Sequence, residues 1–178
     1  MNRLKLDPTA AALLLFALFY FFDRSGAAAA LLPAVTAHEL GHALLLRVHG
    51  AHLHRLRVTP VGLIIDYTGH LDRQGRLLSL AAGPLAGALY ALAALRMGQA
   101  YAVLSGQISL LLTVYNLLPI LPLDGGRILV ELTGSVAARR ISRMSSGVLF
   151  VLGLAALLRF GALTLPLSAF WLLLYNCL

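Results

Sequence analysis

Long stretches without a charged side chain constrain this chain more than any other feature. Residues 97–123 form a run of 27 residues that contains no Asp, Glu, Lys or Arg. A helix of about 20 apolar residues is long enough to cross the hydrocarbon core of a bilayer. Only 12% of the 178 residues are charged and 60% are hydrophobic, and one aqueous core could not bury that much apolar surface. The sequence therefore predicts an integral membrane protein rather than a soluble enzyme.

Six apolar segments can be counted along the chain. They cover residues 10–22, 25–46, 77–95, 97–123, 144–158 and 160–178. The first is short and follows two basic residues, so a cleaved signal peptide is an alternative there. We expect an all-α polytopic membrane protein with about six transmembrane helices. It should form a single core over residues 1–178, with no appended soluble domain.

The distribution of arginine and lysine predicts the orientation of these helices. In a six-helix arrangement, 11 of the 14 basic residues fall on the side of the two termini. Basic loops stay in the cytoplasm, so both termini should be cytoplasmic, in a membrane that we expect to be the bacterial cytoplasmic membrane. The net charge of +7 then reflects topology, and no basic stripe with interleaved aromatic side chains predicts nucleic-acid binding.

The stretch between the second and third segments has the pattern of strands. Apolar and polar residues alternate around Leu56 and Val58, and a second β-rich run follows Pro60; this is the period of a strand. We expect a short membrane-associated β-hairpin, and an exposed edge of it could bind an extended substrate. The expected substrate-binding residues are Leu56, Val58 and Ile64. A plain surface loop is the alternative.

Two histidines and a glutamate interrupt the second apolar segment. His38 and His42 are four residues apart, so on a helix both imidazoles point to one side and can bind one metal ion. Glu39 lies beside them and can accept a proton from water. Ionisable groups in an apolar span are costly and need a partner. The arrangement is typical of zinc hydrolases; a polar contact between helices is the alternative.

A hydrolytic zinc ion has three protein ligands, so a third must come from elsewhere. Asp124 is the first charged residue after the long uncharged run, and it follows Pro119 and Pro122, which end or kink a helix. In the six-helix arrangement His42 and Asp124 both lie towards the cytoplasmic face. A capping role for Asp124 is one alternative. Ligation from the polar loop is another, through His49, His52, His54, Asp66, His70 or Asp72.

Three segments together resemble the site-2 protease family of intramembrane zinc metalloproteases. Residues 116–127 resemble its N-x-x-P-x-x-P-L-D-G signature, residues 38–42 its H-E-x-G-H, and residues 81–87 its A-G-P-x-x-N. Gly87 stands where the family commonly has Asn, so it is assigned no role. The six-segment layout is similar to the sporulation-type branch.

The resemblance implies a function and a set of site residues. His38, His42 and Asp124 would bind one zinc ion per chain, Glu39 would be the catalytic base, and Asn116 would act in the active site, near the substrate or the reaction intermediate. The six-helix arrangement places this active site near the cytoplasmic face. The reaction would be hydrolysis of a peptide bond in or beside a membrane segment of a protein substrate, such as a pro-sigma or anti-sigma factor. A regulatory membrane protein is a further expected partner. The alternative is a zinc-binding membrane transporter or adaptor, but Glu39 favours the enzyme because transport needs no general base.

Overall fold

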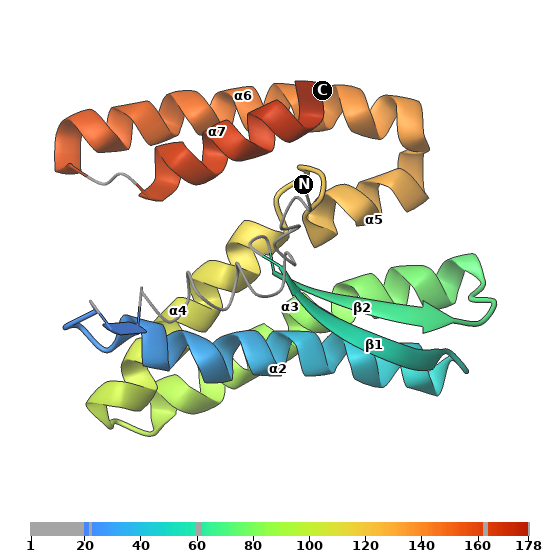
Figure 1. Ribbon diagram of the computed structural model, residues 1–178, viewed down its shortest axis with the longest axis horizontal. Coiled ribbons are helices and arrows are strands. Elements are labelled where there is room, and N and C mark those ends of the chain that lie inside the picture. Colours follow the sequence, from blue (N-terminus) through green and yellow to red (C-terminus); the bar gives the residue numbers. More distant parts are fainter. Residues whose placement is uncertain (1–19, 22, 60–61, 162–163, 178) are drawn as a thin grey trace, which may run out of the picture. The chain divides into compact units, whose positions relative to one another are not determined.

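The computed structural model describes residues 20–21, 23–59, 62–161 and 164–177. The described elements follow in the order α2 (Ala27–Val48), β1 (His52–Thr59), β2 (Gly62–Thr68), α3 (Arg73–Arg96), α4 (Ala100–Asn116), α5 (Asp124–Thr133), α6 (Ser135–Phe160) and α7 (Thr164–Cys177) (Figure 1). The chain forms two compact units, residues 1–113 and residues 114–178. The fold is thus mostly helical with one small sheet, as the sequence predicts.

Three of the described helices are long and apolar enough to cross a membrane: α2, α3 and α6. Helix α7 is apolar but has 14 residues, and the first predicted segment, residues 10–22, lies almost wholly outside the described residues. A total of six spanning helices therefore stays a prediction.

The fourth apolar segment contains a helix followed by a loop. The uncharged run of residues 97–123 is not one helix, because α4 has 17 residues and ends at Asn116. The chain then makes tight turns in which Leu118 N donates to Tyr115 O and Leu123 N donates to Ile120 O. Pro119 and Pro122 follow the helix end, and proline cannot donate the hydrogen bond that would continue a helix.

The predicted β-hairpin is present. Strands β1 and β2 pair antiparallel, with Leu56 opposite Ile65 and Val58 opposite Leu63. A buried apolar cluster of Leu46, Ala51 and Leu71, with Leu53 packed against it, joins the base of the hairpin to the end of α2. The hairpin therefore follows directly from the helix that carries the two histidines.

Small residues let α2 and α3 approach closely. A Cβ atom on Gly41 of α2 would lie 2.3 Å from the carbonyl oxygen of Ala82 and 2.7 Å from the Cβ of Ala86. Without a side chain at Gly41, the two helices pack backbone against backbone. The resemblance segment of residues 81–87 thus lies against the middle of α2.

Polar side chains of α4 bind backbone carbonyls of α2 and α3. Ser105 Oγ donates to Ala30 O at 2.7 Å, and Ser109 Oγ donates to Gly87 O at 2.8 Å. Tyr101 Oη donates to Ala29 O at 3.0 Å. Because Pro33 has no N–H, it cannot bond to Ala29 O four residues earlier, and the tyrosine satisfies this carbonyl instead. Such bonds matter in lipid, where water is not there to replace them.

The second unit contains the loop of residues 117–123 and helices α5, α6 and α7. Helices α6 and α7 pack side by side (Figure 1). A Cβ atom on Gly153 of α6 would lie 2.8 Å from the Cα of Pro166 on α7, so glycine permits this close packing. Helix α6 begins at Ser135 rather than near Met144. Arg139, Arg140 and Arg143, which precede the predicted apolar segment, therefore belong to the helix and not to a loop.

Candidate metal centre

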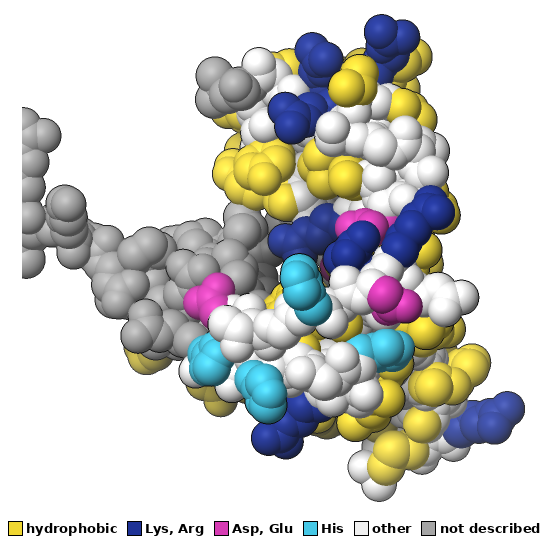
Figure 2. Space-filling view, turned by 90° about the vertical axis from the view of Figure 1, so that its right-hand side faces the viewer, with side chains coloured by type: hydrophobic (Ala, Val, Ile, Leu, Met, Phe, Trp, Pro, Cys, Tyr) yellow, Lys and Arg dark blue, Asp and Glu magenta, His cyan; other side chains and the backbone are white. Residues whose placement is uncertain are grey.

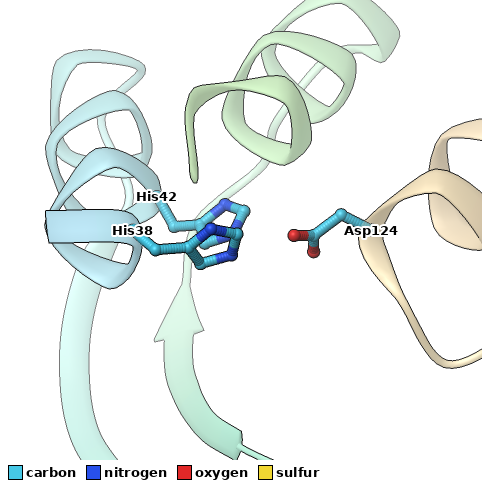
Figure 3. Close-up of side chains that lie close together, drawn as sticks. All are labelled: His38, His42 and Asp124. Atoms are coloured by element: carbon cyan, nitrogen blue, oxygen red, sulfur yellow. The ribbon is translucent and has the colours of Figure 1, made fainter. Parts of the chain in front are cut away.

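His38 and His42 present their imidazoles side by side on α2 (Figure 3). The two Nε2 atoms are 3.2 Å apart. The ring centroids are 4.9 Å apart and the rings are nearly perpendicular, at 76°. His38 is buried, with 4% of its surface exposed. The structure thus confirms that the spacing of four residues brings both rings to one side of the helix.

The backbone of α3 sets the tautomer of His42. His42 Nδ1 is 2.7 Å from the carbonyl oxygen of Ser79. A carbonyl oxygen can only accept, so the proton of neutral His42 lies on Nδ1 and donates to Ser79 O. The Nε2 atom then carries the lone pair that a metal ion needs. Metal-binding histidines commonly donate their other N–H in this way.

The spacing of the two nitrogens fits a zinc ion. Zinc–nitrogen bonds are about 2.0–2.1 Å long in a tetrahedral site, which puts two such nitrogens roughly 3.3 Å apart. The observed separation of the Nε2 atoms is 3.2 Å. Little movement of the two side chains would therefore be needed to bind one ion between them.

Gly83 of α3 makes room for His42. A Cβ atom at this position would lie 2.1 Å from His42 Nε2. Sequence reasoning placed Gly83 only within a resemblance segment and gave it no role of its own. Gly83 is far from the histidines in the sequence and lies in an apolar helix. Its sequence context therefore gives no signal of such a contact.

Gly87 of α3 lies beside His38 and α4. A Cβ atom there would be 2.7 Å from Thr113 Oγ1 and 3.7 Å from His38 Nδ1. Gly87 therefore allows α3 and α4 to approach at the level of His38. This assigns a packing role to a residue that the sequence left unassigned.

Glu39 lies next to the histidine pair on α2. It is half-buried and lies three residues before His42, so the two side chains are neighbours on the helix surface. A carboxylate in this place can hold a water molecule and accept its proton.

The polar-loop alternatives for the third ligand do not join the histidine pair. His49 Nδ1 donates to Leu45 O of its own helix at 2.8 Å, and His54 Nε2 bonds to Thr68 Oγ1 across the hairpin at 2.6 Å. Asp72 Oδ1 accepts from Gly75 N and caps α3. Among the described residues, no group of possible metal ligands unites His38 and His42 with His49, His52, His54, Asp66, His70 or Asp72.

The remaining loop histidines lie at the surface. His52, His54 and His70 are exposed, and Figure 2 shows histidine side chains spread over one face of the molecule rather than converging. Exposed side chains that do not converge are typical of solvated loop residues.

Asp124 and Asn116 belong to the second unit. Asp124 is the first residue of α5 and is buried, with 7% of its surface exposed (Figure 3). The positive end of a helix dipole stabilises a carboxylate at this position. Asn116 is the last residue of α4 and is half-buried. The loop between them thus runs between two helix ends.

Two glycines pack the start of α5 against the preceding loop. A Cβ atom on Gly125 would lie 2.2 Å from Leu117 O, and one on Gly126 would lie 2.5 Å from the carbonyl carbon of Ile120. The D-G-G sequence therefore permits a backbone contact that any side chain would block.

Comparison with known proteins agrees with this architecture. The model of Peptidase family M50 matches residues 97–160, which include Asn116 and Asp124. The structure of the Site-2 Protease from Methanocaldococcus jannaschii aligns with a TM-score of 0.68 over 95% of this chain and 86% of that chain, at 21% identity. The fold of this chain is therefore similar to the fold of that protease.

Two curated proteins are similar in sequence. Zinc metalloprotease MJ0392 of Methanocaldococcus jannaschii is 29% identical over 56% of this chain and 32% of its own length. A protein of Synechocystis sp. assigned as a zinc metalloprotease is 27% identical over 81% of this chain and 42% of its own length. The matched part thus spans less than half the length of either relative.

Both relatives carry the name of zinc metalloproteases. In the described part of this chain, the paired Nε2 atoms and the tautomer of His42 suit a metal ion, and three helices are long and apolar enough to cross a membrane.

Proposed function

We propose that this chain is the catalytic core of an intramembrane zinc metalloprotease that cleaves a membrane-associated segment of a protein substrate. One observation carries the proposal: two imidazoles with Nε2 atoms 3.2 Å apart lie in an apolar helix next to Glu39. Two histidines alone would suit a transporter equally well. The adjacent carboxylate favours hydrolysis, because only hydrolysis needs a base to activate water.

The proposed zinc ligands are His38, His42 and Asp124. Among the described residues, none of the polar-loop alternatives groups with the histidine pair, and this favours Asp124. It is buried at a helix start, and a buried carboxylate needs a cation or hydrogen-bond donors as compensation. The sequence around it also resembles the signature of the protease family.

Zinc in such a site lowers the pKa of water towards neutrality and polarises the scissile carbonyl group. Glu39 accepts the proton of the attacking water and later gives it to the leaving amine, so the carboxylate returns to its ionised form. His42 keeps its proton on Nδ1 through Ser79 O and so stays oriented. Asn116 has an amide that can donate to the oxygen on which negative charge develops.

The proposed substrate site is the β-hairpin. A helical substrate segment hides its peptide bonds, so it must be extended before attack. Strands can bind an extended chain by adding it to an edge, largely without regard to sequence. The part of β1 and β2 around Leu56, Val58 and Ile64 is proposed to serve in this way, supported by the antiparallel pairing of the two strands.

The proposal also has an orientation and a biological setting. Both termini and the catalytic site are proposed to face the cytoplasm of a bacterial cell, on the basis of the distribution of basic residues. A pro-sigma or anti-sigma factor is the proposed type of substrate, and processing during sporulation is the specific case that the six-segment layout suggests.

The test compares the native chain with Glu39→Gln. Both proteins are co-expressed with candidate membrane substrates, and cleavage and zinc content are measured. Gln is nearly the same size as Glu but cannot accept the proton, so cleavage should be lost while zinc is retained. Turnover at the native rate in the variant would exclude Glu39 as the base.

A further inference from the structure

Two polar side chains bind both peptide groups of Leu121, in the loop that precedes Asp124. Leu121 N donates to Ser142 Oγ of α6 at 2.7 Å, and Asn176 Nδ2 of α7 donates to Leu121 O at 2.8 Å. Ser142 Oγ in turn donates to Asn176 Oδ1 at 2.5 Å. The three residues form a closed ring of hydrogen bonds, and we call Ser142 and Asn176 the Leu121 clamp.

The Ser142 hydroxyl and the Asn176 amide both make several hydrogen bonds. The second N–H of the Asn176 amide donates to Leu172 O at 2.8 Å, and the Ser142 hydroxyl both accepts and donates. Ser142 is fully buried, at 0% exposure. Hydrogen bonds in such surroundings are strong, and removing one partner leaves a buried polar group unsatisfied. The clamp should therefore hold Leu121 in one place.

The place of Leu121 determines where α5 begins. A Cβ atom on Gly126 would lie 2.6 Å from Leu121 N, so the first turn of α5 lies directly against the clamped peptide group. Leu123 N also donates to Ile120 O, and Arg127 N donates to Leu123 O. Asp124 is the first residue of this helix. Few flexible bonds separate the clamp from the Asp124 carboxylate.

We propose that Ser142 and Asn176 are positioning residues that fix the backbone from which Asp124 binds zinc. The inference rests on the proposed function in one respect, that Asp124 is the third ligand. It assigns a catalytic purpose to the last two helices, which carry neither the histidine motif nor Asp124. An Asn near the end of an apolar helix is costly unless it is bonded, and the clamp accounts for it.

The experiment uses Ser142→Ala and Asn176→Ala in the full chain, with Ser146→Ala as the matched control. Ser146 lies one turn further along α6 and is also fully buried, but its hydroxyl donates to Arg143 O of its own helix. The first measurement is hydrogen–deuterium exchange of residues 117–123 in metal-free protein. The second is zinc affinity, measured by competition with a chelator, together with that of Asp124→Ala.

Both clamp variants should speed exchange in the loop and weaken zinc binding by about tenfold or more, the usual effect of losing an outer-shell partner. Ser146→Ala should do neither. The double variant should weaken zinc binding little more than either single variant, because the two residues act as one unit.

Three outcomes would overturn the inference, and they are distinguishable. If residues 117–123 exchange at the native rate in both variants, the clamp does not hold the loop, regardless of the zinc affinity. Faster exchange with native zinc affinity, while Asp124→Ala loses zinc, would leave the proposed metal site standing and remove the positioning role. Native zinc affinity in Asp124→Ala would remove the proposed ligand set, and the positioning role with it.

Discussion

The two parts of the proposed metal site are held in different ways. His38 and His42 stand on one continuous helix, and the helical repeat alone brings their rings together. Asp124 stands at the start of a short helix after a loop, and side chains from α6 and α7 hold that loop. Local geometry therefore supplies the first pair of side chains, whereas tertiary contacts supply the third.

This difference has a consequence for how each part tolerates change. A helix keeps its repeat when a neighbouring residue is altered, so the histidine pair should be sensitive mainly to steric pressure from α3. A loop has no repeat, so the Asp124 segment should be sensitive to every contact that holds it.

The largest effect is expected from loss of a ligand. His42→Ala and Asp124→Ala should each abolish proteolysis and leave purified protein with little zinc, because two remaining ligands do not close the coordination shell. Metal analysis after purification measures this directly. Full zinc content in Asp124→Ala alone would mean that the histidine pair recruits a different third ligand.

One glycine substitution beside His42 and one beside the loop before Asp124 should show how each part of the proposed metal site is held. The first tests contact with a side chain and the second tests contact with the backbone. Gly83→Ala would place a methyl group 2.1 Å from His42 Nε2, so the ring must move and zinc affinity should fall by more than tenfold, while the fold persists. Gly126→Ala would place a methyl group 2.5–2.6 Å from backbone atoms of the preceding loop. Backbone atoms cannot rotate away as a side chain can, so this variant should lower both the zinc affinity and the thermal stability.

Gly147→Ala is the control for both glycine variants. A Cβ atom at this helical position meets no atom within 4 Å, and alanine favours helix over glycine by about 1 kcal/mol. Its zinc affinity should be native and its stability unchanged or higher. A loss of affinity equal to that of Gly83→Ala would show that the effect is not specific to the space beside His42.

The sequence predicted the histidine pair and the hairpin because both depend on local periodicity. A spacing of four residues and an alternation of two need no knowledge of the rest of the chain. Pro119 and Pro122 predicted that a helix ends or kinks before Asp124, but the absence of charge over residues 97–123 did not show that the helix ends as early as Asn116.

The contacts that position the site could not be predicted in this way. The roles of Gly83 and Gly87 depend on which helix lies against α2. The Leu121 clamp joins residues 21 and 55 positions apart in sequence. No local pattern marks Ser142 or Asn176 as different from other polar residues in apolar helices. Asp124 was recognisable as a candidate site residue because a charge after a long uncharged run is itself a signal.

A smaller effect should follow from Tyr101→Phe, which tests how the histidine helix is held. The variant removes the donor to Ala29 O, the carbonyl that Pro33 leaves without a helical partner. Stability should fall by about 1 kcal/mol, the usual net worth of such a bond, with zinc affinity unchanged because the histidine pair keeps its helical repeat. The measurement is thermal unfolding in detergent, with the exposed Tyr175→Phe as the control. An equal loss in both variants would mean that the bond to Ala29 contributes nothing specific.

The smallest effect concerns Asp23, which lies before α2 much as Asp124 begins α5. Its carboxylate accepts hydrogen bonds from the Ser25 hydroxyl and from the backbone N–H groups of Ser25 and Ala28. The Ser25 side chain and then these N–H groups lower the pKa of Asp23 below its ordinary value of 3.8. A carboxylate with a lowered folded-state pKa stabilises the fold above the unfolded-state pKa, and this contribution is lost as the pH falls through the folded-state value.

Asp23→Asn should therefore unfold at a slightly lower temperature than the native chain at pH 7, and the difference should shrink as the pH falls below about 4. Zinc affinity at pH 7 should be native, because Asp23 bonds to N–H groups at the start of α2 and, of the two aspartates, only Asp124 is proposed to bind the ion. A difference in melting temperature that stays constant down to pH 3 would show that ionised Asp23 does not stabilise the start of α2.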